Sequence, residues 1–289
     1  MIIILITSAA LLSANKKRTP YERVIIIGVD GAGSFFKDVD APYFNSIFEP
    51  ENVTYSMKVV FPSLSAQCWG SMMYGVLPDT HGLSNDRVEN VRPSEDLHSF
   101  FYYAHQQYPD EPIASIVGWS PINYGIVDGF DGMYLYPNKV LGKSLTNDEV
   151  VKAVIDYFSQ NDPKLLYIQF DDVDHAGHSK GWCSPEYYKV LTDTDKDIGT
   201  IYEYLRDNEK LDGTLFIVTA DHGGKDNNHG GDTLEEMRAV FAVAGRGLDD
   251  NNNVGDMCII DIPAIVYYAL GIENGGLTER NVPTGIFGK

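Results

Sequence analysis

The feature that most constrains the fold is a set of short, unbroken apolar runs that lie far apart along the chain. The clearest are Val24–Val29, Leu165–Phe170 and Thr214–Thr219, with the sequences VIIIGV, LLYIQF and TLFIVT. Such runs are typical of strands buried on both faces of a sheet. Longer stretches with helical periodicity separate them, which predicts an α/β fold with a mostly parallel central sheet and helices on both faces.

Other segments complete this predicted architecture. A helix is expected over 65–74, ending at Gly75, a residue type that commonly terminates helices. Asn147 is the expected N-cap of a helix over 148–158. Helices over 185–205 and 262–270, the latter ending at Gly271, and strands over 53–61, 113–117 and 240–243 are also predicted.

Aspartates and histidines gather directly after the three apolar runs. Asp30 follows the first run, the segment 171–178 follows the second, and Asp221 and His222 follow the third. In open α/β sheets, ligands bind beyond the carboxyl ends of the strands. A single Asp-His pair is more often a surface ion pair, but three clusters at three strand ends favour a common site.

The side chains of these clusters are oxygen and nitrogen ligands that suit zinc above all. The four-residue spacing in DHAGH suits one face of a helical turn, and NNHGG is expected on the same loop as TADHGG. A catalytic zinc typically has three protein ligands and one open position. Six residues could therefore hold two ions: Asp30, Asp174, His178, Asp221, His222 and His229.

The formal net charge of −19 bears on the partners. It leaves no basic surface for duplex nucleic acid. It would also repel an anionic substrate, unless bound cations reverse the sign locally. The cysteines form no CxxC, which excludes a thiolate zinc knuckle, and at most one disulfide is expected among Cys68, Cys183 and Cys258.

A nucleophile is predicted in FPSLSAQCWGSMMYG. Ser65 would lie in the first turn of a helix, where unpaired N–H groups and the helix dipole favour an anion. A coordinated metal can activate its hydroxyl. Taken alone, Ser65 or Ser63 would more often be a helix cap. Aromatic residues such as Trp69 and Trp119 could stack on a leaving group, but they are more often core residues.

The N-terminus, MIIILITSAALLSANKK, resembles a secretory signal sequence with a cleavage site near Ala14. Residues 1–18 are therefore predicted to be a signal peptide or N-terminal anchor, and the protein to be secreted or at the cell surface. Contact with a membrane is expected only through this segment, if it is uncleaved. A buried first strand is the alternative.

Three other classes of enzyme fit the motifs poorly. GVDGAG has the spacing GxxGxG rather than the dinucleotide-binding GxGxxG. No GxxxxGK[ST] occurs, which excludes a P-loop NTPase. No C/S-x-P-x-R string occurs, as a sulfatase would require.

Four blocks in order resemble the alkaline phosphatase superfamily, and most closely its nucleotide pyrophosphatase/phosphodiesterase branch. They are IIIGVDG, FPSLSAQCW…GVLPDTHGLSND, DDVDHAGH and TADHGG…NHGG, and they span residues 24 to about 231. The resemblance implies an alkaline-phosphatase-like fold and two Zn²⁺ ions, with other divalent cations such as Mn²⁺ as substitutes. It implies one ion on Asp174, His178 and His229, and the other on Asp30, Asp221, His222 and Ser65.

The resemblance also implies an asparagine that binds a phosphoryl oxygen. Asn85 in HGLSND is the candidate, although Asp86 stands in the expected slot. Gln67-Cys68 replaces the Pro-Asn that is familiar after the nucleophile.

The activity implied is hydrolysis of a small-molecule phosphate ester, a nucleotide among the candidates, through a phosphoseryl intermediate. The compact length implies that 21–289 form one catalytic domain without a large cap. A phosphomonoesterase or phosphomutase of the same superfamily is an alternative. A non-catalytic metal-binding protein that keeps the fold is an alternative from another class.

Overall fold

The structure is a computed structural model that describes residues 20–88, 90–136, 144–248, 254, 256–272 and 286–287. Within these ranges, seven strands form one sheet in the order β2-β7-β6-β1-β5-β3-β4. The strands are β1 (Arg23–Val29), β2 (Val53–Lys58), β3 (Ile113–Val117), β4 (Tyr134–Tyr136), β5 (Leu165–Phe170), β6 (Thr214–Thr219) and β7 (Arg238–Ala244).

The centre of the sheet is parallel, as the sequence predicts. β1 pairs in parallel with β5 on one side and with β6 on the other. β3 pairs in parallel with β5 and β4. Every residue of β1, β5 and β6 is buried, in agreement with their unbroken apolar runs. β7 runs antiparallel to both β6 and β2, an orientation that the sequence did not predict.

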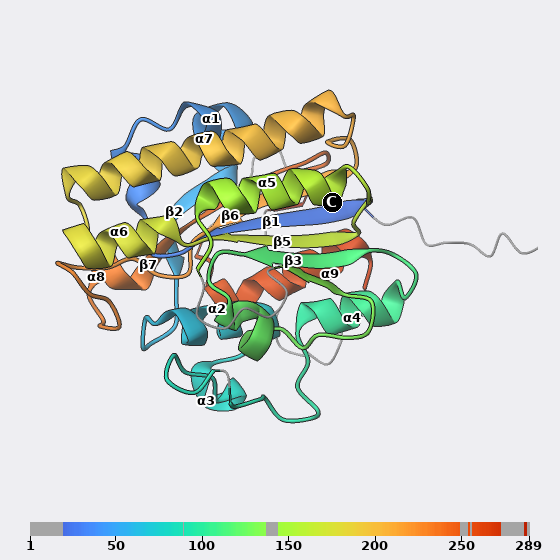
Figure 1. The fold of residues 1–289 in the computed structure, drawn as a ribbon, viewed down its shortest axis with the longest axis horizontal. Coiled ribbons are helices and arrows are strands. Elements are labelled where there is room, and N and C mark those ends of the chain that lie inside the picture. The colour runs from blue at the N-terminus through green and yellow to red at the C-terminus, as the bar shows by residue number, and fades with distance from the viewer. Residues whose placement is uncertain are drawn as a thin grey trace, which may run out of the picture.

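Helices cover both faces of the sheet (Figure 1). α1, α5, α6 and α7 lie over one face, and α2, α4 and α9 lie over the other. The helices are α1 (Pro42–Ile47), α2 (Ser65–Tyr74), α3 (Pro78–His81), α4 (Phe100–Gln107), α5 (Asn147–Phe158), α6 (Asp172–Lys180), α7 (Pro185–Asp207), α8 (Leu234–Met237) and α9 (Ile262–Leu270). The predicted fold class, α/β with a mostly parallel sheet between helices, is confirmed.

Several predicted element boundaries differ from the structure by one to three residues, and two of these differences have a clear physical cause. β2 ends at Lys58 rather than at residue 61, because the chain turns towards Pro62, which has no N–H group to continue a ladder. The N-cap of α5 is Thr146 rather than Asn147. The side chain of Thr146 accepts a hydrogen bond from the Glu149 N–H, and Glu149 bonds back to the N-cap backbone, which forms a capping box.

The predicted signal peptide over residues 1–18 lies outside the described residues. Among the helices that are described, none has both the length and the apolar character needed to cross a membrane. None of the three cysteines takes part in a disulfide.

Candidate metal centre

The three polar clusters meet at the carboxyl ends of three neighbouring strands. Asp30 follows β1 directly. α6, which carries the DHAGH sequence, starts just after β5. Asp221 and His222 follow β6. Because β5, β1 and β6 are adjacent in the sheet, the side chains that the sequence placed at strand ends converge in space.

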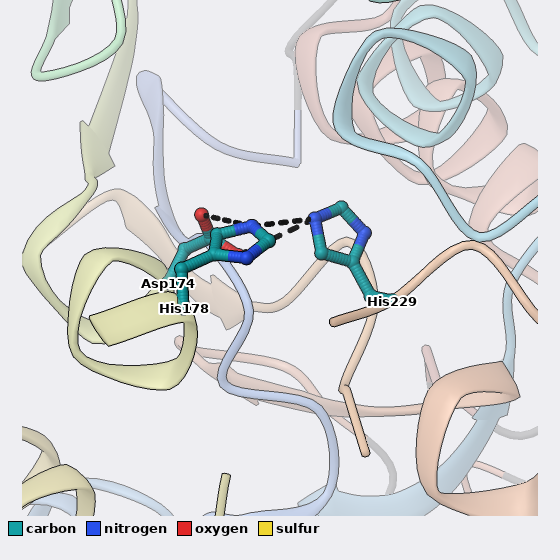
Figure 2. Close-up of side chains that lie close together, drawn as sticks. All are labelled: Asp174, His178 and His229. Atoms are coloured by element: carbon teal, nitrogen blue, oxygen red, sulfur yellow. Dashed lines mark hydrogen bonds and ion pairs between the residues drawn. The ribbon is translucent and has the colours of Figure 1, made fainter. Parts of the chain in front are cut away.

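The first group consists of Asp174, His178 and His229 (Figure 2). Asp174 and His178 are one turn apart on α6, which confirms the helical spacing. Nε2 of His178 lies 3.4 Å from Oδ2 of Asp174 and 3.1 Å from Nε2 of His229. Nε2 of His229 lies 3.7 Å from Oδ1 of Asp174. This group is open on one side, since the His178 side chain is 43 % exposed.

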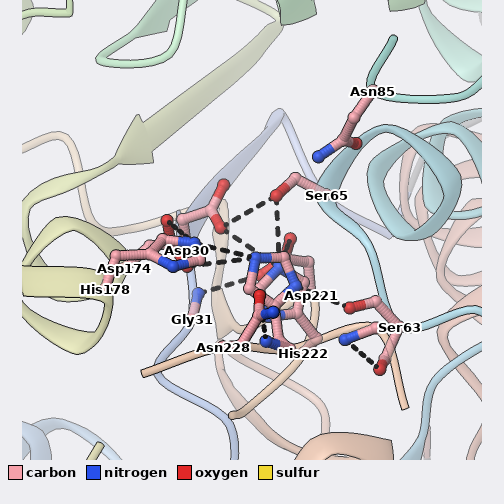
Figure 3. Close-up of polar contacts among 12 residues, drawn as sticks. Asp30, Gly31, Ser63, Ser65, Asn85, Asp174, His178, Asp221, His222 and Asn228 are labelled. Carbon is pink, nitrogen blue, oxygen red and sulfur yellow. Dashed lines mark hydrogen bonds and ion pairs between the residues drawn. The ribbon is translucent and has the colours of Figure 1, made fainter. Parts of the chain in front are cut away.

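The second group lies deeper (Figure 3). Asp30, His222 and Asp174 each place a ligand atom within 4.8 Å of the others, so Asp174 belongs to both groups. Nε2 of His222 lies 3.4 Å from Oδ1 of Asp30 and 3.2 Å from Oδ2 of Asp221. Asp221 therefore lies next to this group because its Oδ2 is close to the His222 ring. Asp30, Asp221 and His222 are all buried.

All three histidines are oriented in the same way by the backbone. Nδ1 lies 3.0 Å from the Asn227 carbonyl in His178, 2.9 Å from the Gly223 carbonyl in His222, and 2.8 Å from the Ser63 carbonyl in His229. A carbonyl only accepts hydrogen bonds, so each Nδ1 carries the proton and each Nε2 presents a lone pair. The Nε2 lone pairs of His178 and His229 face one another, which a bound cation would stabilise.

The protonation states and buried carboxylates of the site also fit bound cations. Burial lowers the pKa of both His222 and His229 to about 3, so both rings are neutral at pH 7. Burial raises the pKa of Asp30 to about 6, and it raises the pKa values of Asp174 and Asp221 well above their ordinary range. Oδ1 of Asp174 and Oδ2 of Asp221 are buried without a hydrogen-bond partner. Neutral imidazoles and crowded carboxylates with unpaired oxygens fit a pair of divalent ions.

Gly31 allows the first two clusters to approach closely. Its φ is +66°, and a Cβ at this position would lie 2.9 Å from the Cα of Asp174. Its N–H donates to Oδ1 of Asp221 at 3.1 Å. A side chain at residue 31 would therefore push α6 away from the end of β1.

Ser65 lies beside the second group. It is the first residue of α2, with Leu64 rather than a serine as the N-cap, so Ser65 makes no cap hydrogen bond. Its Oγ lies 3.1 Å from Nε2 of His222 and 3.4 Å from Oδ1 of Asp30. The hydroxyl thus lies both at a helix N-terminus and next to the candidate ligands (Figure 3).

Asn85, rather than Asp86, lies next to Ser65. Oδ1 of Asn85 accepts a hydrogen bond from the Ala66 N–H at 2.8 Å, and its amide nitrogen points towards Ser65 (Figure 3). Asp86 is exposed and accepts a hydrogen bond from the Ser84 hydroxyl. Of these two residues, Asn85 is therefore the one that lies beside the nucleophile candidate.

Three residues that contact the ligands were not recognised as such in the sequence. The indole of Trp69 and the amide of Gln169 both donate to Asp30. The indole of Trp182 donates to the Gly31 carbonyl and packs edge-on against the His178 ring. A signal existed for two of them, because Trp69 is four residues after Ser65 and Gln169 is the one amide in a buried strand.

Comparison with known proteins agrees with this geometry. The family model described as type I phosphodiesterase / nucleotide pyrophosphatase matches residues 24–271. Ectonucleotide pyrophosphatase/phosphodiesterase family member 7 of Mus musculus is 21% identical over 245 residues, which cover 76% of this chain and 55% of that protein. Family member 1 of Mus musculus is 25% identical over 221 residues, 67% of this chain and 23% of that protein. The chain therefore spans about half, or less, of the length of these relatives.

Solved structures show the same fold. An inactive variant of murine ectonucleotide pyrophosphatase/phosphodiesterase 5 in complex with AMP has a TM-score of 0.72 at 16% identity, over 92% of this chain and 100% of that chain. A 2-O GAG sulfatase has a TM-score of 0.68 at 12% identity, over 90% of this chain and 73% of that chain. Because the family model matches most of the chain, the chain belongs to the type I phosphodiesterase / nucleotide pyrophosphatase family.

Proposed function

We propose that this protein hydrolyses phosphoric esters, as a phosphodiesterase or nucleotide pyrophosphatase, with Ser65 as the nucleophile and two zinc ions as cofactors. The observation that carries the proposal is the position of the Ser65 hydroxyl, which lies 3.1 Å from His222 and 3.4 Å from Asp30 at the edge of the convergent ligand cluster. A helix-capping serine would have no reason to face buried ligand atoms.

The geometry favours a division of the ligands into an outer and an inner site. The outer site would consist of Asp174, His178 and His229, and the inner site of Asp30, Asp221 and His222 with Ser65 as the fourth ligand. Other divalent ions such as Mn²⁺ could replace zinc, because the donor set contains only nitrogen and oxygen atoms. When bound, such ions would lower the pKa of the serine hydroxyl and offset the negative charge of the substrate.

The residues of the chain then support a two-step displacement. Ser65 loses its proton to solvent, and its Oγ forms a bond to phosphorus while the bond from phosphorus to the leaving alcohol breaks. Asn85 donates its amide N–H to a phosphoryl oxygen and so orients the substrate. Water then breaks the Oγ–P bond, which releases the phosphate product and restores the hydroxyl.

The substrate class is a small phosphate ester, and a nucleotide is the leading candidate because a family relative is known in complex with AMP. We further propose that residues 21–289 act as one catalytic domain without a large cap. The apolar N-terminal segment supports a secreted or cell-surface location, in line with the ectonucleotide relatives.

A rate comparison tests the proposal. Wild type and Ser65→Ala are assayed with 4-nitrophenyl phosphate and with bis(4-nitrophenyl) phosphate, and the zinc content of each sample is measured. We expect the diester to be the better substrate. We expect Ser65→Ala to lower the rate by roughly 10³-fold or more, since the loss of a nucleophile removes the covalent path.

Ser65→Thr is the matched control, because it keeps a hydroxyl and should keep measurable activity. Equal rates for wild type and Ser65→Ala would remove Ser65 from its role. A zinc-loaded wild type that cleaves neither ester would instead favour the non-catalytic alternative, and a strong preference for the monoester would favour a phosphomonoesterase.

A further inference from the structure

We propose that Trp69 and Gln169 are positioning residues that together fix Asp30 so that only one of its two oxygens is available to the inner metal ion. The proposal rests on the function proposed above, because it concerns one of the ligands of that site. It assigns a role to two buried side chains that belong to neither metal group.

Both oxygens of Asp30 have distinct surroundings. Oδ1 faces the site, 3.4 Å from Nε2 of His222 and 3.4 Å from the Ser65 hydroxyl. Oδ2 faces away and accepts two hydrogen bonds, at 2.8 Å from Nε1 of Trp69 and at 3.0 Å from Nε2 of Gln169. With Oδ2 occupied by two N–H donors, the carboxylate can offer only Oδ1 to an ion.

The amide of Gln169 can be oriented in only one way. Its Oε1 accepts a hydrogen bond from the Trp119 backbone N–H at 2.8 Å, so its NH₂ group must face the carboxylates. That NH₂ group donates to Oδ2 of Asp30 and to Oδ1 of Asp171, at 3.2 Å. The neutral amide of Gln169, near the end of β5, therefore connects three groups: the Trp119 backbone after β3, the Asp30 carboxylate after β1 and the Asp171 carboxylate after β5.

Trp69 connects the same carboxylate to the nucleophile helix. Ser65 and Trp69 are one turn apart on α2, so they lie on the same face of the helix. One contacts Oδ1 of Asp30 and the other Oδ2. The indole is fully buried against Gly28, where a Cβ would come within 2.4 Å of its ring. The glycine in β1 thus leaves room for the indole that sets the distance between nucleophile and ligand.

The two donors also suit the charge of the ligand. Hydrogen bonds from Trp69 and Gln169 lower the pKa of Asp30 against the larger effect of burial. Because the donors are neutral, they orient the carboxylate without cancelling the negative charge that an ion needs. A lysine or arginine in either place would compete with the metal for that charge.

The test is zinc binding by competition with a chelating dye, which needs no turnover. The variants are Trp69→Phe and Gln169→Met, each of which removes the N–H donor and keeps an apolar side chain of related shape. We expect two zinc ions to bind the wild type. We expect each variant to weaken only the inner ion, by roughly 10- to 100-fold, as is usual for residues that orient a metal ligand.

The assignment to the inner site is made in the His178→Ala background, in which the outer site is impaired. Trp119→Phe is the matched control, because it alters a tryptophan whose indole does not contact Asp30, and it should leave both affinities unchanged. If Trp69→Phe perturbs folding, Gln169→Met provides the result independently.

Three outcomes must be kept apart. Unchanged affinities in both Trp69→Phe and Gln169→Met, in protein that binds two ions, would overturn the role of the two donors and leave the proposed function intact. A wild type that binds no zinc would instead contradict the proposed function itself. Equal weakening of both ions would show that the variants act through general loss of structure, and this too would overturn the proposal.

Discussion

The two halves of the candidate metal centre differ sharply in burial. In the outer half the side chains of His178, Asp174 and His229 are 43 %, 15 % and 5 % exposed. In the inner half, Asp30, Asp221 and His222 are at most 1 % exposed. The outer half is held by a short helix and a loop, whereas the inner half follows directly from the central strands of the sheet.

This difference suggests different tasks for the two halves. A ligand at the surface can be replaced by water or by substrate, so the outer half suits the exchange of an oxygen ligand. Buried carboxylates with no water to solvate them depend on a cation for their charge balance. We therefore expect the inner ion to contribute to the stability of the fold and the outer ion to contribute mainly to activity.

The largest contrast is expected between His222→Ala and His178→Ala. The first removes a buried nitrogen that no water can replace well, so inner zinc affinity should fall by more than the roughly 10- to 100-fold typical of residues that only orient a ligand. The second removes an exposed nitrogen, and a smaller loss at the outer site should result. Calorimetric zinc titrations of the two variants measure this, and equal losses of affinity would contradict the proposed difference between the two halves.

A smaller effect is expected in the kinetics of metal release. Excess EDTA should remove zinc from the wild type in two phases, because the outer ion is accessible to the chelator and the inner ion is not. His178→Ala should alter only the fast phase and leave the slow one unchanged. A single phase that accounts for both ions would show that the two halves open together.

The smallest effect is expected in the pH dependence of the melting temperature of the metal-stripped protein. Burial raises the pKa of Asp30 to about 6 and that of Asp171 to about 7, from 3.8. A carboxyl whose pKa is raised by folding stabilises the fold while it is protonated, and this contribution is lost as the pH rises through 6 to 7. The buried His222 and His229, whose pKa values are lowered to about 3, act in the opposite direction up to about pH 6.5. The raised pKa values of Asp174 and Asp221 add to the carboxyl effect and extend it to higher pH. The metal-stripped protein should therefore melt at a lower temperature at pH 8 than at pH 5, and zinc should reverse the loss at pH 8.

Asp30→Asn separates this effect from general charge repulsion. It should flatten the pH dependence of the melting temperature, whereas Asp131→Asn, which removes the same charge from an exposed turn, should not. A wild type that is as stable at pH 8 as at pH 5 without metal would contradict the assignment of buried carboxylates as the source.

The sequence predicted the centre of the molecule better than its margins. Unbroken apolar runs identify β1, β5 and β6, because only strands buried on both faces have that pattern. The direction of β7, which lies between β2 and β6, could not be predicted, because an apolar run has the same pattern in either direction and the connection before the strand decides which one it takes. The end of β2 was predicted too late in the chain. After the ladder stops at Lys58, the Val59 N–H still donates to the Met237 carbonyl just before β7, so the residues after Lys58 keep a strand-like sequence without forming the ladder.

The candidate site shows a similar limit. Strand-end aspartates and histidines could be found from sequence, because their position relative to apolar runs is a local property. The membership of Asp174 in both groups depends on how α6 sits on the sheet, which is a tertiary property. The positions of Trp69 and Gln169 gave a signal, but the sequence could not show that both side chains donate to Asp30, because that contact also depends on tertiary packing.

Two loop segments that lie side by side next to Ser65 position the nucleophile candidate, and they do not carry the inner ligands. The segment 59–64 runs beside 229–237, joined by bonds from Val59 to Met237 and from the Ser63 hydroxyl to Gly231. The inner ligands are carried elsewhere, on the central strands. We therefore expect a substitution in either segment to shift the Ser65 hydroxyl while the inner ligands stay in place, so the distance between hydroxyl and ligands can be changed without a change in the core.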